Sequence, residues 1–108
     1  MNQEDICAAL ASADQEILVI IAEPFLESVD KDREQLIRDA AAQDFKGLEI
    51  VAHSLKGVVG HFAMPDLEAR LRQIENNARV EKLDADQLHE VLVVLDALAR
   101  ALRAYLPA

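Results

Sequence analysis

His53 stands at the start of a run, residues 52–62, whose residue types could carry out chemistry on the surface of a helix. An imidazole side chain ordinarily titrates near pH 6.5, so close to neutral pH it can act as a base, a nucleophile or a metal ligand. Lys56 follows three residues later, which on a helix places its ammonium group one turn away from the imidazole. The spacing predicts a chemically active histidine with a positively charged side chain beside it.

Spacing argues against two kinds of histidine chemistry. A metal site needs further ligands, but His61 is eight residues from His53, and His89 belongs to a different predicted helix. A hydrolytic triad needs a nucleophile held against the base, but on a helix Ser54 points about 100° away from His53. Two alternatives remain, a solvated surface histidine without a role and a nucleophile.

A nucleophilic histidine suits the transfer of a phosphoryl group. One ring nitrogen attacks the phosphorus atom while the other donates a hydrogen bond that fixes the tautomer. The phosphoryl group then brings up to about two negative charges. Lys56 is placed to offset these charges through a charge-assisted contact.

A helix from Asp44, which can cap it, to about residue 62 or 63 must position this histidine. At about 100° per residue, the apolar residues fall on one side of it, namely Leu48, Val51, Ala52, Leu55, Val58, Val59 and Phe62. His53 falls on the opposite side, within about 60° of Lys46, Glu49, Lys56, Gly57, Gly60 and Met64. The sequence therefore predicts that the imidazole projects into solvent.

Two glycines lie on the same side of the predicted helix as His53. Each costs a helix interior about 1 kcal/mol relative to alanine, and neither is needed for the buried side. One explanation is that Gly57 or Gly60 simply ends the helix. The apolar pattern continues past both glycines, however, which favours a surface that something must approach closely.

The first part of the chain predicts two further helices. Residues 4–11 form a short one, and a capping box of Ser12 and Gln15 opens a long one that ends near residue 43. Pro24 interrupts the long helix, so we expect a kink near residues 20–22 and two segments.

The last part of the chain predicts two more helices of clear amphipathic spacing. One begins at Met64-Pro65 and ends near residues 79–82. The other begins at Asp84 and Gln87 and ends at Leu106, where Pro107 stops it. With short connections and no strand pattern, we expect an all-α fold, an antiparallel up-down four-helix bundle with a short extra N-terminal helix.

Composition restricts the class of protein. The 108 residues suit a single domain spanning 1–108, and the net charge of −9 without a basic cluster argues against nucleic-acid binding. The single cysteine, Cys7, permits no internal disulfide and fits the cytoplasm. No signal-peptide pattern or apolar run long enough to span a membrane is present, so we expect a cytoplasmic protein without a membrane partner. Met1 and the lack of a linker favour a free-standing protein over a domain excised from a hybrid kinase.

A family resemblance agrees with this interpretation. The residues His53-Ser54-Leu55-Lys56-Gly57, followed by Gly60 and Phe62, resemble the H-x-L-K-G…G…F signature of histidine-containing phosphotransfer (HPt) domains. The similarity continues into Leu67, Leu71, Ile74 and Glu75, and more loosely upstream into residues 25–27 and 42–44. It departs from the family at Ala63, where a glycine is usual, and His61 occupies a variable position.

The resemblance implies a four-helix bundle and a set of site residues. His53 would be phosphorylated, Lys56 would be its charge partner, and Gly57 would provide clearance. Glu75 lies where chemotaxis histidine kinases place an acid that hydrogen-bonds the histidine. The residues alone favour a different place for Glu75, at the edge of a packing face.

The resemblance also implies the partners. The protein would take a phosphoryl group from a receiver-domain aspartate of a response regulator or hybrid histidine kinase, or from a kinase directly, and pass it on without independent turnover. It would need no cofactor of its own, since Mg²⁺ is held by the receiver. Docking would use Glu49, Ile50, Gly60 and Met64 on a monomer. The alternative is a helical module that binds a signalling partner without being phosphorylated.

Overall fold

Residues 2–106 are described by the structure, a computed structural model, and are almost entirely helical. The elements are α1 (Gln3–Ser12), α2 (Gln15–Ala41), α3 (Phe45–Val59), a 3₁₀ turn η1 (Gly60–Phe62), α4 (Pro65–Arg79) and α5 (Ala85–Tyr105). The expected all-α fold is confirmed.

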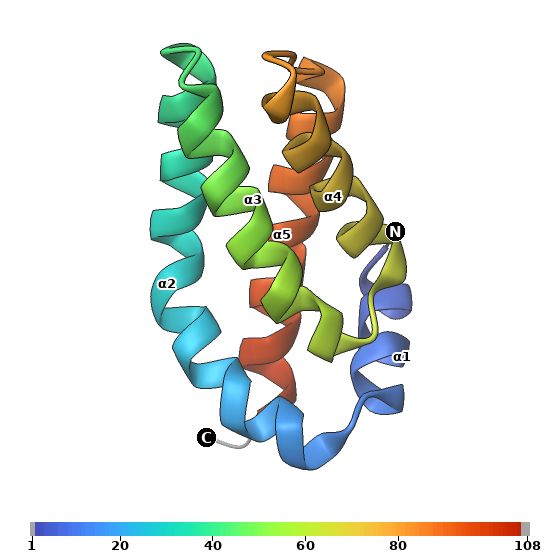
Figure 1. The fold of residues 1–108 in the computed structure, drawn as a ribbon. Helices are drawn as coiled ribbons and strands as arrows, with labels where there is room; N and C mark the ends of the chain where they lie inside the picture. Colours follow the sequence, from blue (N-terminus) through green and yellow to red (C-terminus); the bar gives the residue numbers. More distant parts are fainter. Residues whose placement is uncertain (1, 107–108) are drawn as a thin grey trace.

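Helices α2 to α5 lie side by side and alternate in direction, as Figure 1 shows. Helix α3 packs between α2 and α4, while α5 packs against α1, α2 and α4. The short helix α1 lies at the end of the bundle where α3 turns into α4. This is the antiparallel four-helix bundle with an extra N-terminal helix that the periodicity and short connections predict.

The helices α3, α4 and α5 begin at the predicted signals, and α2 does not. Asp44 accepts a hydrogen bond from the Gly47 amide, and Asp84 accepts one from the Gln87 amide. Pro65 occupies the first turn of α4, where its missing N–H costs nothing. The predicted cap of α2 is wrong, because Ser12 still belongs to α1 and Asp14 caps α2 instead.

Helix α2 passes through Pro24 without ending. Proline has no N–H to donate to the Ile20 carbonyl, and its ring crowds that carbonyl, which favours a bend in this part of the helix. Figure 1 shows α2 bending in its light-blue part. The expected kink is therefore present, but the two expected segments form one continuous helix.

Helix α3 is fixed in the bundle by its apolar side. Leu48, Ala52, Leu55 and Val59 are buried, and Phe62 beyond them meets the ring of Phe25 edge to face with centroids 5.3 Å apart. On α4, the buried residues facing the core include Leu67, Leu71, Ile74 and Ala78. Because Ala52 is fully buried and Leu55 almost so, the orientation of His53 between them is set by the core.

The chain leaves α3 through a sharp turn that corrects two predictions. The α-helix ends at Val59 and not at residue 62 or 63, and Gly60 is its cap, as the alternative explanation of this glycine expects. Gly60 keeps a right-handed conformation, with φ −57°, and Ala63 instead takes the left-handed one, with φ 57° and ψ 43°. This conformation costs an alanine about 1–2 kcal/mol, which a glycine avoids. The turn breaks the helical phase before Met64, so Met64 points into the core and is 1% exposed. Its predicted position on the outer surface is wrong. The predicted stop at Pro107 lies outside the described residues.

Candidate functional site

His53 projects from the middle of α3 into solvent, with 68% of its side chain exposed. Its Nδ1 atom is not free, because it lies 2.7 Å from Oε2 of Glu75 on α4. Helices α3 and α4 are direct neighbours, which brings these residues together across 22 positions of sequence. The contact therefore depends on the packing of the two helices.

Glu75 is a buried carboxylate held by several donors. It is 2% exposed, and its other oxygen, Oε1, accepts a hydrogen bond of 2.7 Å from the Lys56 ammonium group. The hydrogen bond from Lys56 lowers the pKa of the Glu75 carboxyl below its ordinary value, and that from His53 acts in the same direction against the effect of burial. The side chain is therefore ionised at neutral pH.

The ionised carboxylate determines the tautomer of His53. A carboxylate can only accept hydrogen bonds, so Nδ1 of His53 must carry the proton that it shares with Glu75. In the neutral ring, the lone pair then lies on Nε2, the nitrogen that Glu75 leaves free. This arrangement can present a nucleophilic nitrogen to a group that approaches from solvent.

Lys56 lies close to the site but is directed at Glu75. Its side chain is 21% exposed, and its ammonium group donates a hydrogen bond to the Glu75 carboxylate. The structure thus joins His53, Lys56 and Glu75 in one hydrogen-bonded group. The role of Lys56 as a charge partner of a phosphoryl group stays a prediction.

Sequence reasoning missed Arg79, which completes this group. Its Nη2 atom lies 3.1 Å from Oε2 of Glu75, and its Nε atom lies 3.6 Å from Oε2 of Glu49. A signal was present in the sequence, since Glu75 and Arg79 are four residues apart on a helix and so face each other. An open hollow of about 290 Å³ adjoins the imidazole and is lined by Glu49, Ile50, His53, Glu75 and Arg79.

Some of the predicted clearance and docking residues lie at the surface near His53, and others do not. A Cβ atom added to Gly57 would meet nothing within 4 Å, so the surface one turn beyond His53 is open. Glu49 and Ile50 lie in the hollow beside His53, and Ile50 is 57% exposed. Gly60 lies at the end of α3, where Glu68 of α4 is 3.6 Å from the position of an added Cβ. Met64 is buried and cannot touch a partner in this structure.

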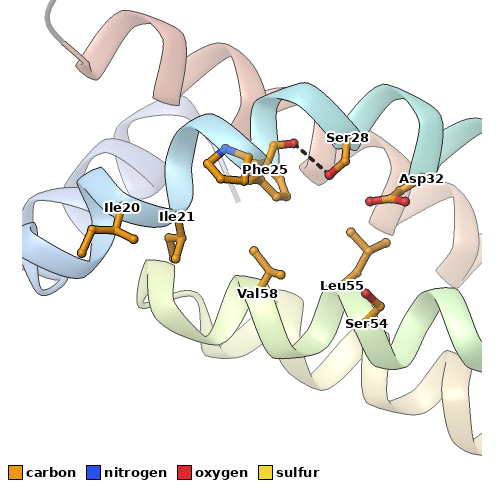
Figure 2. A pocket seen from close by; sticks show the side chains of 9 residues that line it. Ile20, Ile21, Phe25, Ser28, Asp32, Ser54, Leu55 and Val58 are labelled. Carbon is orange, nitrogen blue, oxygen red and sulfur yellow. Dashed lines mark hydrogen bonds between the residues drawn. The ribbon is translucent and has the colours of Figure 1, made fainter.

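A second surface feature, also missed from the sequence, is an apolar groove of about 300 Å³ between α2 and α3. Its lining comes from Ile20, Ile21, Pro24, Phe25, Ser28 and Asp32 of α2, and from Ser54, Leu55 and Val58 of α3. Figure 2 shows Val58 and Leu55 rising from α3 towards α2, with Asp32 towards one end of the groove and Ile20 towards the other. Burial raises the pKa of the Asp32 carboxyl, although Ser28 and Lys31 act in the opposite direction.

The sequence matches the Hpt domain family over residues 21–105, which includes α3, α4, α5 and most of α2. The chain belongs to the Hpt family. Hpt domains are helical bundles with a histidine phosphotransfer role in phosphorelays, where they interact with receiver domains. No curated protein and no solved structure was found to match the chain.

Two further properties of this Hpt domain concern metals and membranes. Within residues 2–106, no three His, Cys, Asp or Glu side chains are grouped so that they could hold a metal ion. None of the helices in the described part of the chain is both long and apolar enough to cross a membrane.

The buried carboxylate predicts a pH-dependent contribution to stability. Replacing Glu75 with glutamine is expected to lower the free energy of unfolding at pH 7 by about 1–2 kcal/mol, because it weakens the charge-assisted hydrogen bonds to Lys56 and His53. A carboxyl whose pKa is lowered on folding stabilises the protein above its unfolded pKa, about 4.3, and loses this effect as the pH falls through its folded pKa. Urea unfolding of wild type and Glu75→Gln should therefore differ at pH 7 and converge in acid.

The matched control is Glu68→Gln on the same helix. Glu68 is 35% exposed and pairs with Arg72 at 3.5 Å, a surface contact worth less than about 1 kcal/mol. Equal losses for the two variants at pH 7, or a Glu75→Gln loss that persists in strong acid, would contradict the assignment of a buried ionised carboxylate.

Proposed function

We propose that His53 accepts a phosphoryl group on Nε2 from the aspartyl phosphate of a receiver domain and passes it to the aspartate of a second receiver. The observation that carries this proposal is the exposed ring of His53, whose Nδ1 is held by the buried carboxylate of Glu75 while Nε2 is left free. Family membership supplies the general role in phosphotransfer.

The transfer forms one bond and breaks one. The Nε2 lone pair attacks phosphorus, an N–P bond forms, the P–O bond to the receiver aspartate breaks, and the aspartate leaves as a carboxylate. The Nδ1 proton stays on the ring in its hydrogen bond to Glu75, which offsets the positive charge that develops there. Mg²⁺ is held by the receiver, so this chain needs no cofactor of its own.

The test is to incubate the protein with a phosphorylated receiver and to characterise any phosphate on it. A phosphohistidine is labile in acid and stable in base, and digestion of the labelled protein should place the phosphate on the peptide that contains His53. Absence of label with a broad set of phosphorylated receivers, together with binding to one of them, would favour the alternative of a binding module that is not phosphorylated.

The receiver needs a surface beside His53, and we assign it the groove between α2 and α3. Ser54, the next residue after His53, lines this groove, so the groove begins next to the surface that a partner over the histidine would cover. Ile20 at the groove is 72% exposed, and Ile50 on the other side of His53 is 57% exposed. Exposed apolar side chains in the groove and beside the reactive ring suit a modest and partly apolar interface. We propose that the protein acts in the cytoplasm, where it would meet such partners.

Ile20→Glu is expected to weaken receiver docking by about tenfold, because it places a charge where an apolar side chain would be covered. The fold should be kept, since Ile20 is mostly exposed. The measurement is the receiver concentration that gives half the maximal transfer rate. Val93→Glu is the control, since Val93 is 51% exposed on α5, a helix that does not flank the groove. Equal effects of the two variants would remove the groove from the interface.

A further inference from the structure

The guanidinium group of Arg79 lies beside the hydrogen bond between His53 and Glu75. Its Nη2 atom is 3.1 Å from Oε2 of Glu75, and the same oxygen is 2.7 Å from Nδ1 of His53. One carboxylate oxygen therefore accepts hydrogen bonds from two side chains. Arg79 also lines the hollow that adjoins the imidazole, so its charge lies near the ring.

The charged groups around His53 and its partner Glu75 on α3 and α4 are balanced. Glu49 and Lys56 lie on α3, while Glu75 and Arg79 lie on α4, which gives two negative and two positive charges. Two further charged groups lie farther out. On α3, Lys46 contacts Glu49 at 3.4 Å, and on α2, Asp32 lines the groove on the other side of α3.

Loss of the Arg79 charge would leave this group net negative. A neighbouring negative charge favours the protonated form of an imidazole. The imidazolium ring has protons on both nitrogens and so has no lone pair with which to attack phosphorus. An arginine, in contrast, stays charged at every pH at which proteins are folded, so it can hold the balance constant.

We propose that Arg79 is a positioning residue for His53, which balances the carboxylates of Glu75 and Glu49 and so keeps the imidazole neutral with its Nε2 lone pair available. This inference rests on the proposed function, since only phosphoryl transfer to Nε2 requires the neutral ring. Arg79 acts through Glu75 and does not itself bond to the reacting nitrogen.

The first experiment measures the rate of phosphoryl transfer to the protein against pH. As the pH rises, the rate should increase with the fraction of neutral ring. In Arg79→Ala this rise should move to higher pH by about half a unit at low ionic strength, which is about a threefold lower rate on the rising part of the curve. Arg79→Lys keeps the charge and should keep the wild-type curve. If the curve of rate against pH moved in both variants, or in neither, the proposal would be overturned.

A compensating variant shows whether Arg79 acts through its charge or only by supporting the structure. Glu49→Gln removes a negative charge and should move the curve to lower pH, and the double variant Arg79→Ala/Glu49→Gln should return to the wild-type curve. A merely structural Arg79 predicts that the double variant is no better than Arg79→Ala. The displacements should also shrink in 1 M salt, where the Debye length falls to about 3 Å.

The second readout needs no phosphoryl donor. The ring signals of His53 in an NMR spectrum change when the ring is protonated. The pH at which they change should be higher in Arg79→Ala than in wild type, and the same as in wild type for Arg79→Lys and for the double variant. Ring signals that respond identically in all four proteins would overturn the role of Arg79 even if His53 is phosphorylated. Ring signals in the expected order, without any phosphorylation of wild type, would refute the proposed function but keep the charge balance.

Discussion

Substitution of His53 by glutamine is expected to abolish phosphorylation of the protein by a phosphorylated receiver. The glutamine side chain can still donate a hydrogen bond to Glu75, but its amide nitrogen has no lone pair able to attack phosphorus. The fold should survive, because 68% of the His53 side chain is exposed and the apolar contacts of α3 lie on the opposite side. The measurement is transfer of radiolabelled phosphate, with thermal unfolding recorded in parallel.

His61→Gln and His89→Gln are the matched controls for this substitution. Both histidines are exposed, His61 in η1 and His89 on α5, and both variants should be labelled as fast as wild type. Undiminished labelling of His53→Gln would refute the assignment of the acceptor. Loss of label in His61→Gln with retention in His53→Gln would move the acceptor to η1.

Gly57→Leu should make the protein more stable and much less active. A leucine at this mid-helix position gains up to about 1 kcal/mol over glycine, and an added Cβ meets nothing within 4 Å. Side chains on a helix lean towards its N-terminus, so a leucine at position 57 would cover the surface next to His53, one turn earlier. Holding the receiver even about 1 Å too far away can slow transfer by about 100-fold.

Two variants calibrate this prediction. Gly57→Ala should gain similar stability but lose little activity, because its single methyl group reaches less far over the surface. Ala104→Leu adds the same kind of bulk at an exposed position on α5 and should leave transfer unchanged. Transfer at the wild-type rate by Gly57→Leu would show that position 57 is not a clearance site. A loss of stability in that variant would mean that the fold itself requires the glycine, so that clearance for a partner would not be needed to explain it.

Much of the fold follows from local rules, which is why it could be predicted. Asp44, Pro65 and Asp84 mark helix starts whose chemistry involves only the next few residues. The error at Ser12 arose because Asp14, two residues later, offers an equally good capping side chain, and the choice between them depends on where α1 ends. The continuous course of α2 through Pro24 depends on packing against α3 and α5, which no local rule contains.

The site was predictable where it lies on one helix and less so where it spans two. His53, Lys56 and Gly57 share one face of α3 at fixed spacing, so their proximity follows from periodicity. The contact of Glu75 with His53 depends on the register between α3 and α4, and residue periodicity alone favoured a place for Glu75 at the edge of a packing face. The prediction for Met64 is wrong because it extends the helical periodicity of α3 past Ala63, where a left-handed turn ends that periodicity.

The fixed place of His53 on one ridge of a packed bundle has a kinetic consequence for the proposed relay. With Ala52 buried and Leu55 almost fully buried on either side, the ring cannot swing from one docking surface to another. Donor and recipient would therefore occupy the same face in turn and exclude each other. Such a relay follows ping-pong kinetics. A donor that dissociates slowly after giving up its phosphoryl group blocks the recipient from binding and so slows the second transfer.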